Sequence, residues 1–236
     1  MFKTLETLDT QQHGDLRYTG VPGYAHARAL STAPIAINEI AEAARHFPIL
    51  FPAEGRLLPV ALLSLENGRT PFVSAQDEWV ADYIPAHIRR YPFMLGTTEA
   101  EGRFVVMIDR AAPQFSTDGD EPLFENGAPV AGGVVERARQ FLVEFENLLK
   151  RTEQLLAPLQ EHDVLVQRQF NIQKGDEKKT AVRGFRQVDM DAVSRLDDET
   201  LAGWVRSGLM SVIVAHTHSL KNAQRILRMQ NDDVAA

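Results

Sequence analysis

Cysteine is missing from this chain of 236 residues. That absence excludes disulfide bonds, thiolate nucleophiles, zinc–thiolate sites and iron–sulfur clusters together. Long apolar runs are missing as well. The longest, Leu209–Ala215, is interrupted by Ser211 and is much shorter than the roughly 18 residues that suggest a membrane span. We therefore expect no membrane span and a fold that depends on an ordinary packed core.

The chain also lacks an excess of positive charge. It has 25 Lys and Arg residues against 32 Asp and Glu residues, which gives a formal net charge of −7. Proteins that bind nucleic acids generally carry a basic surface. We therefore expect no nucleic-acid partner. The first 18 residues are polar and charged throughout, without the apolar stretch of a secretory signal. This predicts a cytoplasmic location and leaves signal-independent export open.

Short apolar runs separated by turn residues predict strands in the first half of the chain. Residues 46–52, 57–65 and 104–108 are such runs. Asn67-Gly68 follows the second run, and this dipeptide typically forms hairpin turns, so Thr70–Val73 is the expected partner strand. Residues 33–45 allow two interpretations, a helix over Ile35–Arg45 or a strand over Ala33–Ile37.

The second half is dominated by helical periodicity. Apolar residues recur at helical spacing over Val134–Leu159, and Leu142, Phe145 and Leu149 share one stripe that we expect to be buried. Val164–Ile172 alternates like a half-buried strand. The other elements expected here are an antiparallel partner strand over 181–188, a helix capped by Asp189, another helix capped by Asp197–Glu199, and a last helix over Leu209–Met229 that begins after Gly208.

These patterns together predict an α+β protein, with a mainly antiparallel sheet packed against a long amphipathic helix and a C-terminal helix. Strands occur in both halves and can join a single sheet, so we expect one domain over residues 31–230. Residues 1–30 form an N-terminal segment, and residues 231–236 a frayed tail.

The histidines and carboxylates do not have the spacing of a metal site. His216 and His218 lie two residues apart on an expected helix and point in nearly opposite directions, so one should be buried and the other exposed. Phosphate-binding glycine loops and nucleophile elbows are absent from the sequence. We therefore expect no metal, no cofactor and no catalytic residue.

Aromatic and arginine residues are concentrated between Asp77 and Gly96. This segment contains Trp79, Tyr83, Arg89 and Arg90. Aromatic rings offer contact area, and guanidinium groups can bind carboxylates, so the segment is a candidate binding site. The alternative is that the rings fill the core and the arginines pair with acidic residues.

Several motifs in this chain resemble those of the bacterial SapC family. They are HFPILF at 46–51, WVADYIPAHIRRYPF at 79–93, a strand that ends at Ile108-Asp109, Leu123-Phe124 followed by Gly127, and GLMSVIVAHTHSLKN at 208–222. The resemblance extends over roughly residues 15–229. His46 and Asp109 join the candidate binding residues because they belong to these motifs.

The family resemblance implies that the protein acts together with other proteins. The family is named for an association with bacterial surface layers. Many relatives accompany TonB-dependent receptors, halogenase-like proteins and cupin-like oxygenases. No established catalytic residues come with the family, and the stretch Arg110–Pro113 is less acidic here than the family pattern suggests.

Three functions follow as alternatives. The first is a non-enzymatic accessory protein that binds a peptide, a peptide-modifying enzyme such as a halogenase-like or cupin-like protein, or a surface-layer component. The second is a peptide-modifying enzyme of the oxygenase type, which would need a His-x-Asp/Glu…His ligand set on strand ends, whereas His162-Asp163 is adjacent. The third is a structural surface-layer subunit.

The two neighbouring arginines should have different roles, because adjacent side chains point in different directions. One of Arg89 and Arg90 should pair with a buried carboxylate, Asp109 or Asp77. The other should lie beside Trp79 and Tyr83 and remain free to bind a partner.

Overall fold

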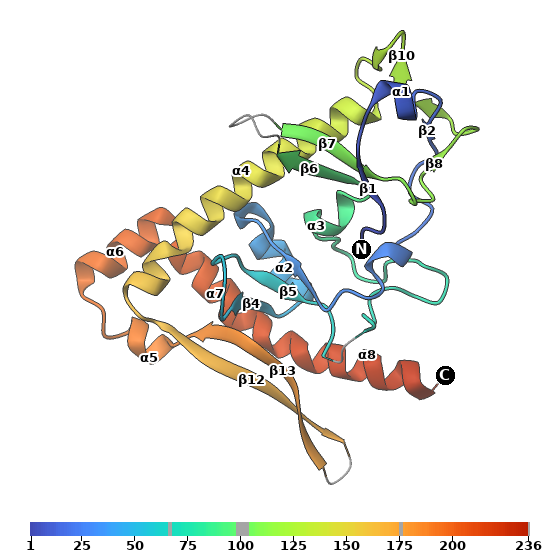
Figure 1. The fold of residues 1–236 in the computed structure, drawn as a ribbon. Coiled ribbons are helices and arrows are strands. Elements are labelled where there is room, and N and C mark those ends of the chain that lie inside the picture. Colours follow the sequence, from blue (N-terminus) through green and yellow to red (C-terminus); the bar gives the residue numbers. More distant parts are fainter. Residues whose placement is uncertain (66–67, 98–103, 175–176, 236) are drawn as a thin grey trace.

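The computed structural model describes residues 1–65, 68–97, 104–174 and 177–235. It has an α+β fold in which one long helix, α4 (Val134–Glu161), runs diagonally from an upper group of strands to a lower body (Figure 1). No described helix is both long enough and apolar enough to cross a lipid bilayer.

The upper group consists of small antiparallel sheets around one end of α4. The largest has the strand order β1–β7–β6, a second has the order β8–β2–β9, and β10 pairs with β11. The elements of this group are β1 (Leu5–Thr7), α1 (Thr10–His13), β2 (Arg17–Tyr18), β6 (Phe93–Thr97), β7 (Phe104–Asp109), β8 (Phe115–Ser116), β9 (Glu121–Pro122), β10 (Phe124–Glu125) and β11 (Ala128–Pro129).

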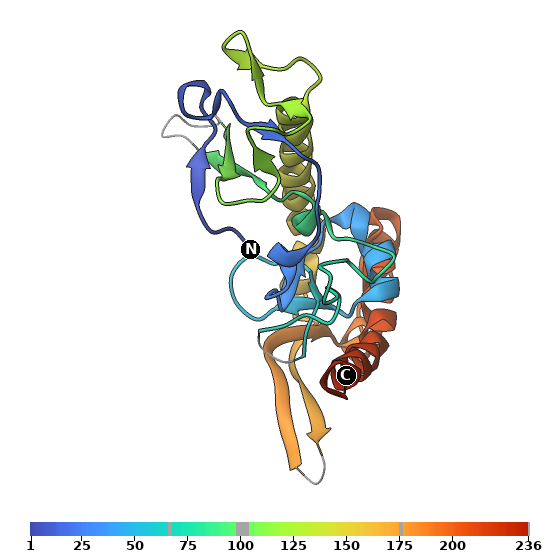
Figure 2. The same ribbon diagram turned by 90° about the vertical axis from the view of Figure 1, so that its right-hand side faces the viewer.

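The lower body contains a five-stranded antiparallel sheet and most of the helices. Its strand order, β12–β13–β4–β5–β3, joins strands from both halves of the chain. Figure 2 shows the β12–β13 hairpin projecting from this body. The strands are β3 (Thr32–Pro34), β4 (Ile49–Pro52), β5 (Val60–Leu62), β12 (Leu165–Lys174) and β13 (Glu177–Val188).

The helices of the lower body pack against this sheet and continue to the C-terminal end of the chain (Figure 1). The α-helices are α2 (Ile40–His46), α3 (Ala86–Arg89), α5 (Met190–Val193), α6 (Asp198–Ser207), α7 (Leu209–Ser219) and α8 (Ala223–Ala235). Short 3-10 helices are η1 (Ala25–Ala27), η2 (Ile37–Glu39) and η3 (Leu220–Asn222).

The buried side chains form three clusters, and α4 contributes to all of them. Leu142 lies in the upper cluster, Phe145 and Leu149 in a small middle cluster, and Leu156 in the main cluster of the lower body. Leu142, Phe145 and Leu149 are each at most 6% exposed. The predicted buried stripe of the long helix is therefore confirmed.

The structure confirms several local predictions about helix caps, a glycine turn and the two histidines of the C-terminal region. Asp189 accepts hydrogen bonds from the first amides of α5, and Asp197 accepts one from Thr200 at the start of α6. Gly208 has φ +85° between α6 and α7, a conformation that glycine adopts without strain. His216 is buried and His218 is exposed, as the helical spacing predicts.

The two interpretations of residues 33–45 are each partly correct. Thr32–Pro34 is strand β3, Ile37–Glu39 is a 3-10 turn and Ile40–His46 is helix α2. The strands also do not all join one sheet. Strand β7 pairs with β1 and β6, apart from the five-stranded sheet.

The predicted hairpin after Leu57–Leu65 is wrong. Asn67 lies outside the described residues, and residues 70–73 form no strand beside β5, which pairs with β3 and β4 instead. The Thr70 hydroxyl donates to the carbonyl of Leu63 at 2.8 Å, so side-chain bonding connects these two segments.

The single C-terminal helix predicted over Leu209–Met229 is also wrong. It is divided into α7, η3 and α8, and α8 continues to Ala235 through the expected frayed tail. At the division, the buried Ser219 hydroxyl donates to the carbonyl of His216 at 2.6 Å and accepts from the amide of Ile49 at 2.8 Å. The side chain of Asn222 donates to the carbonyl of Ala44 at 2.8 Å. These tertiary contacts favour a tighter turn at this point.

Candidate functional site

The candidate residues from the sequence lie in three separate places. Trp79 and Tyr83 lie just before α3, Arg89 is its last residue, and Arg90 follows it. Asp109 lies at the end of β7 beside the N-terminal segment. His46 lies at the end of α2. The structure therefore does not assemble the six candidates into one site.

Glu39 holds the aromatic part of the segment in place. Its carboxylate is only 4% exposed. One oxygen accepts from the Tyr83 hydroxyl at 2.6 Å and from the amide of Ala86 at 2.7 Å, and the other accepts from the amide of Ala36 at 3.0 Å. Burial, followed by the bond to Glu39, raises the pKa of Tyr83. Hydrogen bonding of this kind is what allows a charged carboxylate to be buried.

Trp79 is half-buried and packs against the core. Its indole N–H donates to the carbonyl of Tyr83 at 2.8 Å. Its ring lies 5.9 Å from that of Phe72 and 6.2 Å from that of Phe47, both fully buried. For Trp79 the core-filling alternative is therefore the better description.

Neither arginine makes the expected ion pair with Asp109 or Asp77. Arg89 is exposed; its Nε donates to the carbonyl of Ile84 at 3.0 Å, and its guanidinium lies 5.5 Å from the centre of the Phe141 ring. Arg90 is half-buried, 5.6 Å from the centre of the Phe2 ring. Burial lowers the pKa of Arg90, and Glu146 opposes this shift.

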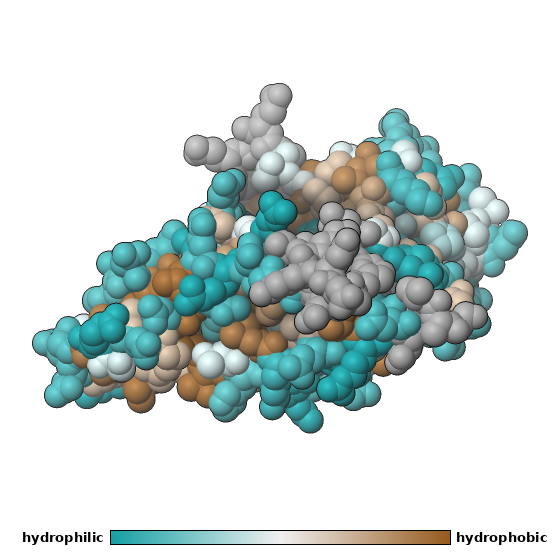
Figure 3. All heavy atoms as spheres, turned by 90° about the horizontal axis from the view of Figure 1, so that it is seen from below, coloured by the Kyte–Doolittle hydropathy of each residue, from teal (hydrophilic) through white to brown (hydrophobic). Residues whose placement is uncertain are grey.

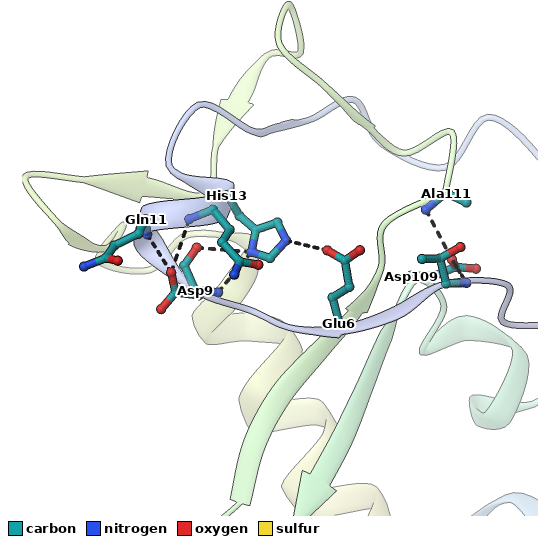
Figure 4. A network of polar contacts seen from close by, with 8 residues as sticks. Glu6, Asp9, Gln11, His13, Asp109 and Ala111 are labelled. Atoms are coloured by element: carbon teal, nitrogen blue, oxygen red, sulfur yellow. Dashed lines mark hydrogen bonds and ion pairs between the residues drawn. The ribbon is translucent and has the colours of Figure 1, made fainter.

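Backbone amides and a tyrosine satisfy Asp109 in place of an arginine. Its buried carboxylate accepts from the amides of Lys3 and Thr4, each at 2.9 Å, and from the Tyr91 hydroxyl at 3.1 Å. Figure 4 shows Asp109 with the amide of Ala111, 3.3 Å from its carboxylate. Burial alone would raise the pKa of Asp109, but these hydrogen bonds lower it overall. Asp109 therefore fastens the N-terminal segment to the end of β7.

The same N-terminal segment carries a second polar network, also shown in Figure 4. Nε2 of the buried His13 lies 3.1 Å from the Glu6 carboxylate, and Asp9 caps helix α1. These contacts fix helix α1 against strand β1 within the segment.

Asp77 and His46 also have local partners. Asp77 forms an ion pair with Arg28. The buried His46 lies 3.2 Å from the Glu42 carboxylate, and its Nδ1 has no hydrogen-bond partner among the described residues. His46 therefore lies apart from the other candidates.

The N-terminal segment and the end of the aromatic segment enclose a cavity of about 340 Å³. We call it the N-terminal cleft and define it by six lining residues, Lys3, Gly23, His26, Asp77, Tyr91 and Gln114. The rings of His26 and Tyr91 are stacked, 4.0 Å apart and 10° from parallel. The Tyr91 hydroxyl also donates to Asp109, one of the candidate residues from the sequence. Asp109 therefore holds a side chain of the cleft in place, although it does not line the cleft itself.

A close backbone approach forms one wall of the cleft. The amide of Tyr24 donates to the carbonyl of Asp77 at 2.6 Å. A Cβ added to Gly23, whose φ is +157°, would lie 3.0 Å from both the carbonyl oxygen and the Cβ of Asp77. Only glycine allows this contact without displacement.

Gln114 is the unusual member of the cleft. It is 0% exposed, and neither its side-chain nitrogen nor its side-chain oxygen has a hydrogen-bond partner among the described residues. A buried amide group without partners costs about 1–3 kcal/mol for each unsatisfied donor or acceptor. Because the amide is fully buried behind the wall of the cleft, a ligand that carries a donor and an acceptor recovers this cost only when the side chain turns toward the cavity.

His26, which lines the cleft, has a lowered pKa. Burial lowers the pKa of His26 to about 4, while its bond to the carbonyl of Ile88 opposes the shift. The ring is therefore neutral at pH 7.

Among the described residues, no three His, Asp or Glu side chains lie close enough together to hold a metal ion.

Sequence reasoning missed Glu39, His26 and Gln114. Glu39 lies near the start of an expected helix, just after an apolar stretch. A glutamate at such a position often caps the helix N-terminus, and this was the available signal. His26 and Gln114 gave no such signal, because their partners lie far away in the sequence.

Comparison with curated proteins gives no match, and comparison with solved structures gives none either. The family model described as SapC matches residues 8–226 of the 236 residues. The match includes the aromatic–arginine segment and every residue that defines the N-terminal cleft except Lys3. Because it covers most of the chain, the protein belongs to the SapC family.

Proposed function

We propose that this protein is a non-enzymatic accessory protein that takes a peptide segment of a partner into the N-terminal cleft. The partner is a peptide-modifying enzyme or a surface-layer component. The observation that carries this proposal is the buried, unpartnered amide of Gln114 in the wall of a cavity.

The chemistry of the cleft suits a peptide. A glutamine amide donates through nitrogen and accepts through oxygen, which matches the C=O and N–H groups of a peptide backbone. The His26–Tyr91 stack offers a flat apolar surface, and Lys3 contributes a positive charge, while Asp77 is paired with Arg28. A segment with a small apolar side chain and charged neighbours fits these walls best.

The test combines partner capture with stability. Tagged wild-type protein is isolated from its own host with its partners, in parallel with Gln114→Leu and with Gln140→Leu as a control, since Gln140 is exposed on α4. We expect Gln114→Leu to lose the captured partner. We also expect its free energy of unfolding to be about 1 kcal/mol larger than that of the wild type, because an apolar group of similar size replaces an unsatisfied buried amide.

The combination of the two measurements is decisive. Loss of binding together with loss of stability would show only that Gln114→Leu is misfolded, so the stability gain is part of the expected result. Capture of the same partner by wild type, Gln114→Leu and Gln140→Leu would contradict the proposal. Hydrogen exchange provides a direct check, since the partner should protect the backbone around Gly23–His26.

A further inference from the structure

One apolar side chain of α7, Val214, lies at the surface among the polar residues Ser211, Thr217 and His218. Helix α7 buries Leu209, Val212 and Ile213 against the body, yet Val214 on its other side is 44% exposed. A surface helix normally presents polar residues to solvent. Figure 3 shows exposed hydrophobic patches among hydrophilic side chains on the underside of the molecule.

A groove lies between this surface and α2. It has a volume of about 610 Å³, and the small side chains of Ala41, Ala44 and Ala215 and the chain of Met210 are among those that line it. Small residues in a groove allow another helix to approach closely.

Basic residues continue from this groove along the C-terminal helices. We define the α7–α8 stripe as Val214, His218, Lys221, Arg225 and Arg228, which recur at alternating steps of four and three residues and are all exposed. Val214 and His218 share a face of α7, Arg225 and Arg228 share a face of α8, and Lys221 lies in the 3-10 turn between the two helices. At the rise of an α-helix, the 14 steps from Val214 to Arg228 correspond to about 21 Å.

The charge of the stripe is not neutralised within the described chain. Its four basic or titratable residues form no ion pair with any other described residue, whereas Arg45 at the groove is paired with Glu42 at 2.9 Å. No Asp or Glu occurs between Leu209 and Asn231, in a chain whose net charge is −7. This separation of charge creates a local positive field on an acidic protein.

We propose that the α2–α7 groove and the α7–α8 stripe bind an acidic amphipathic helix of a partner protein. The apolar face of that helix lies over Val214 and Met210, and its carboxylates, repeated every three or four residues, face Lys221, Arg225 and Arg228. Helix-in-groove binding of this kind places apolar anchors in the groove and charges at its rim. Complementary charge sets the orientation and accelerates association. The stripe's length calls for a partner helix of about four turns.

The test is a site-specific photo-crosslink in the full-length protein in its own host. Benzoylphenylalanine replaces Val214, or His218 in a second variant, and Val205 on α6 is the control position because it is 62% exposed. We expect a crosslink from positions 214 and 218, but not from 205, to an acidic amphipathic segment of another protein, identified by mass spectrometry of the linked peptide.

Charge reversal gives the matched control. Lys221→Glu combined with Arg225→Glu should reduce the crosslink yield about tenfold. Arg139→Glu combined with Arg151→Glu makes the same change of net charge on exposed positions of α4 and should leave the yield unchanged. All of these residues are exposed, so melting temperatures should stay at the wild-type value.

Any of four results would overturn the proposal. These are no crosslink at positions 214 and 218, a crosslink to a second copy of this chain, a crosslink to nucleic acid, and a yield that charge reversal does not change. The surface is separate from the N-terminal cleft, so Gln114→Leu should retain the crosslink.

Discussion

Buried polar residues hold distant segments of this protein together. Glu39 joins the turn before α2 to the start of α3 through Tyr83 and the amide of Ala86. Asp109 joins the end of β7 to the N-terminal segment. In both cases most of the partners are backbone amides, which hold a carboxylate in a defined position.

His216 connects two further segments. Its Nδ1 lies 2.7 Å from the carbonyl of Ile49, to which it donates, and its Nε2 accepts from the amide of Val188 at 3.2 Å. This arrangement requires the neutral ring, because a protonated Nε2 cannot accept. Burial lowers the pKa of His216 to about 4, and the bond to Ile49 opposes the shift.

We predict that protonation of His216 contributes to acid unfolding. Since the folded protein binds this proton less readily than the unfolded chain, stability falls as the pH drops from about 6.5 toward 4. Between pH 7.5 and pH 5 the loss from His216 should be about 2 kcal/mol. Urea unfolding of wild type and His216→Gln at both pH values measures it.

The control for this experiment lies on the same helix. His218 is exposed, so His218→Gln should show the pH dependence of the wild type. His26 and His87 also have lowered pKa values, of about 4 and about 3, so some pH dependence will remain in His216→Gln. An identical loss of stability in wild type and His216→Gln would contradict the prediction.

At the scale of elements, α4 is the principal structural support. Its 28 residues contact all three buried clusters, and Phe145 lies in the middle one. Phe141 lies one turn earlier on the same helix, is half-buried, and stacks on Phe145 with ring centres 6.3 Å apart. The two phenylalanines therefore differ mainly in burial.

We predict that Phe145→Ala lowers the free energy of unfolding by about 3–5 kcal/mol, because it leaves a cavity in a packed cluster. Phe141→Ala should cost clearly less, since solvent can fill part of the space. Chemical denaturation of both variants gives the comparison. Equal losses would show that burial is not what distinguishes the two positions.

At the scale of the whole molecule, α4 links the upper sheets to the lower body (Figures 1 and 2). The upper and main clusters contain different residues, but each includes residues of this helix. Unfolding of either part therefore exposes one face of α4, which favours a cooperative transition.

We predict that the two parts unfold together. Both tryptophans, Trp79 and Trp204, pack in the main cluster, so fluorescence reports on the lower body. Far-ultraviolet circular dichroism reports on the whole chain. The two denaturation curves should coincide, and an earlier step seen only by circular dichroism would show that the upper sheets unfold separately.

The sequence alone predicted the elements whose signals are local. Helical spacing identified α4 and its buried stripe, alternation identified β12, and side-chain caps identified the starts of α5 and α6. These predictions are correct because hydrophobic periodicity and capping depend on residues within a few positions of each other. The α+β class follows from the same elements.

Tertiary structure decided the features that depend on distant residues. The division between α7 and α8 depends on Ile49 and Ala44, more than 160 residues away in the sequence. The cleft brings Lys3, His26 and Gln114 together from three parts of the chain, and Asp109 bonds to the N-terminal segment rather than to a neighbouring arginine. Such partners are chosen by how the chain packs, because a buried polar group must bond to whichever group the fold places beside it.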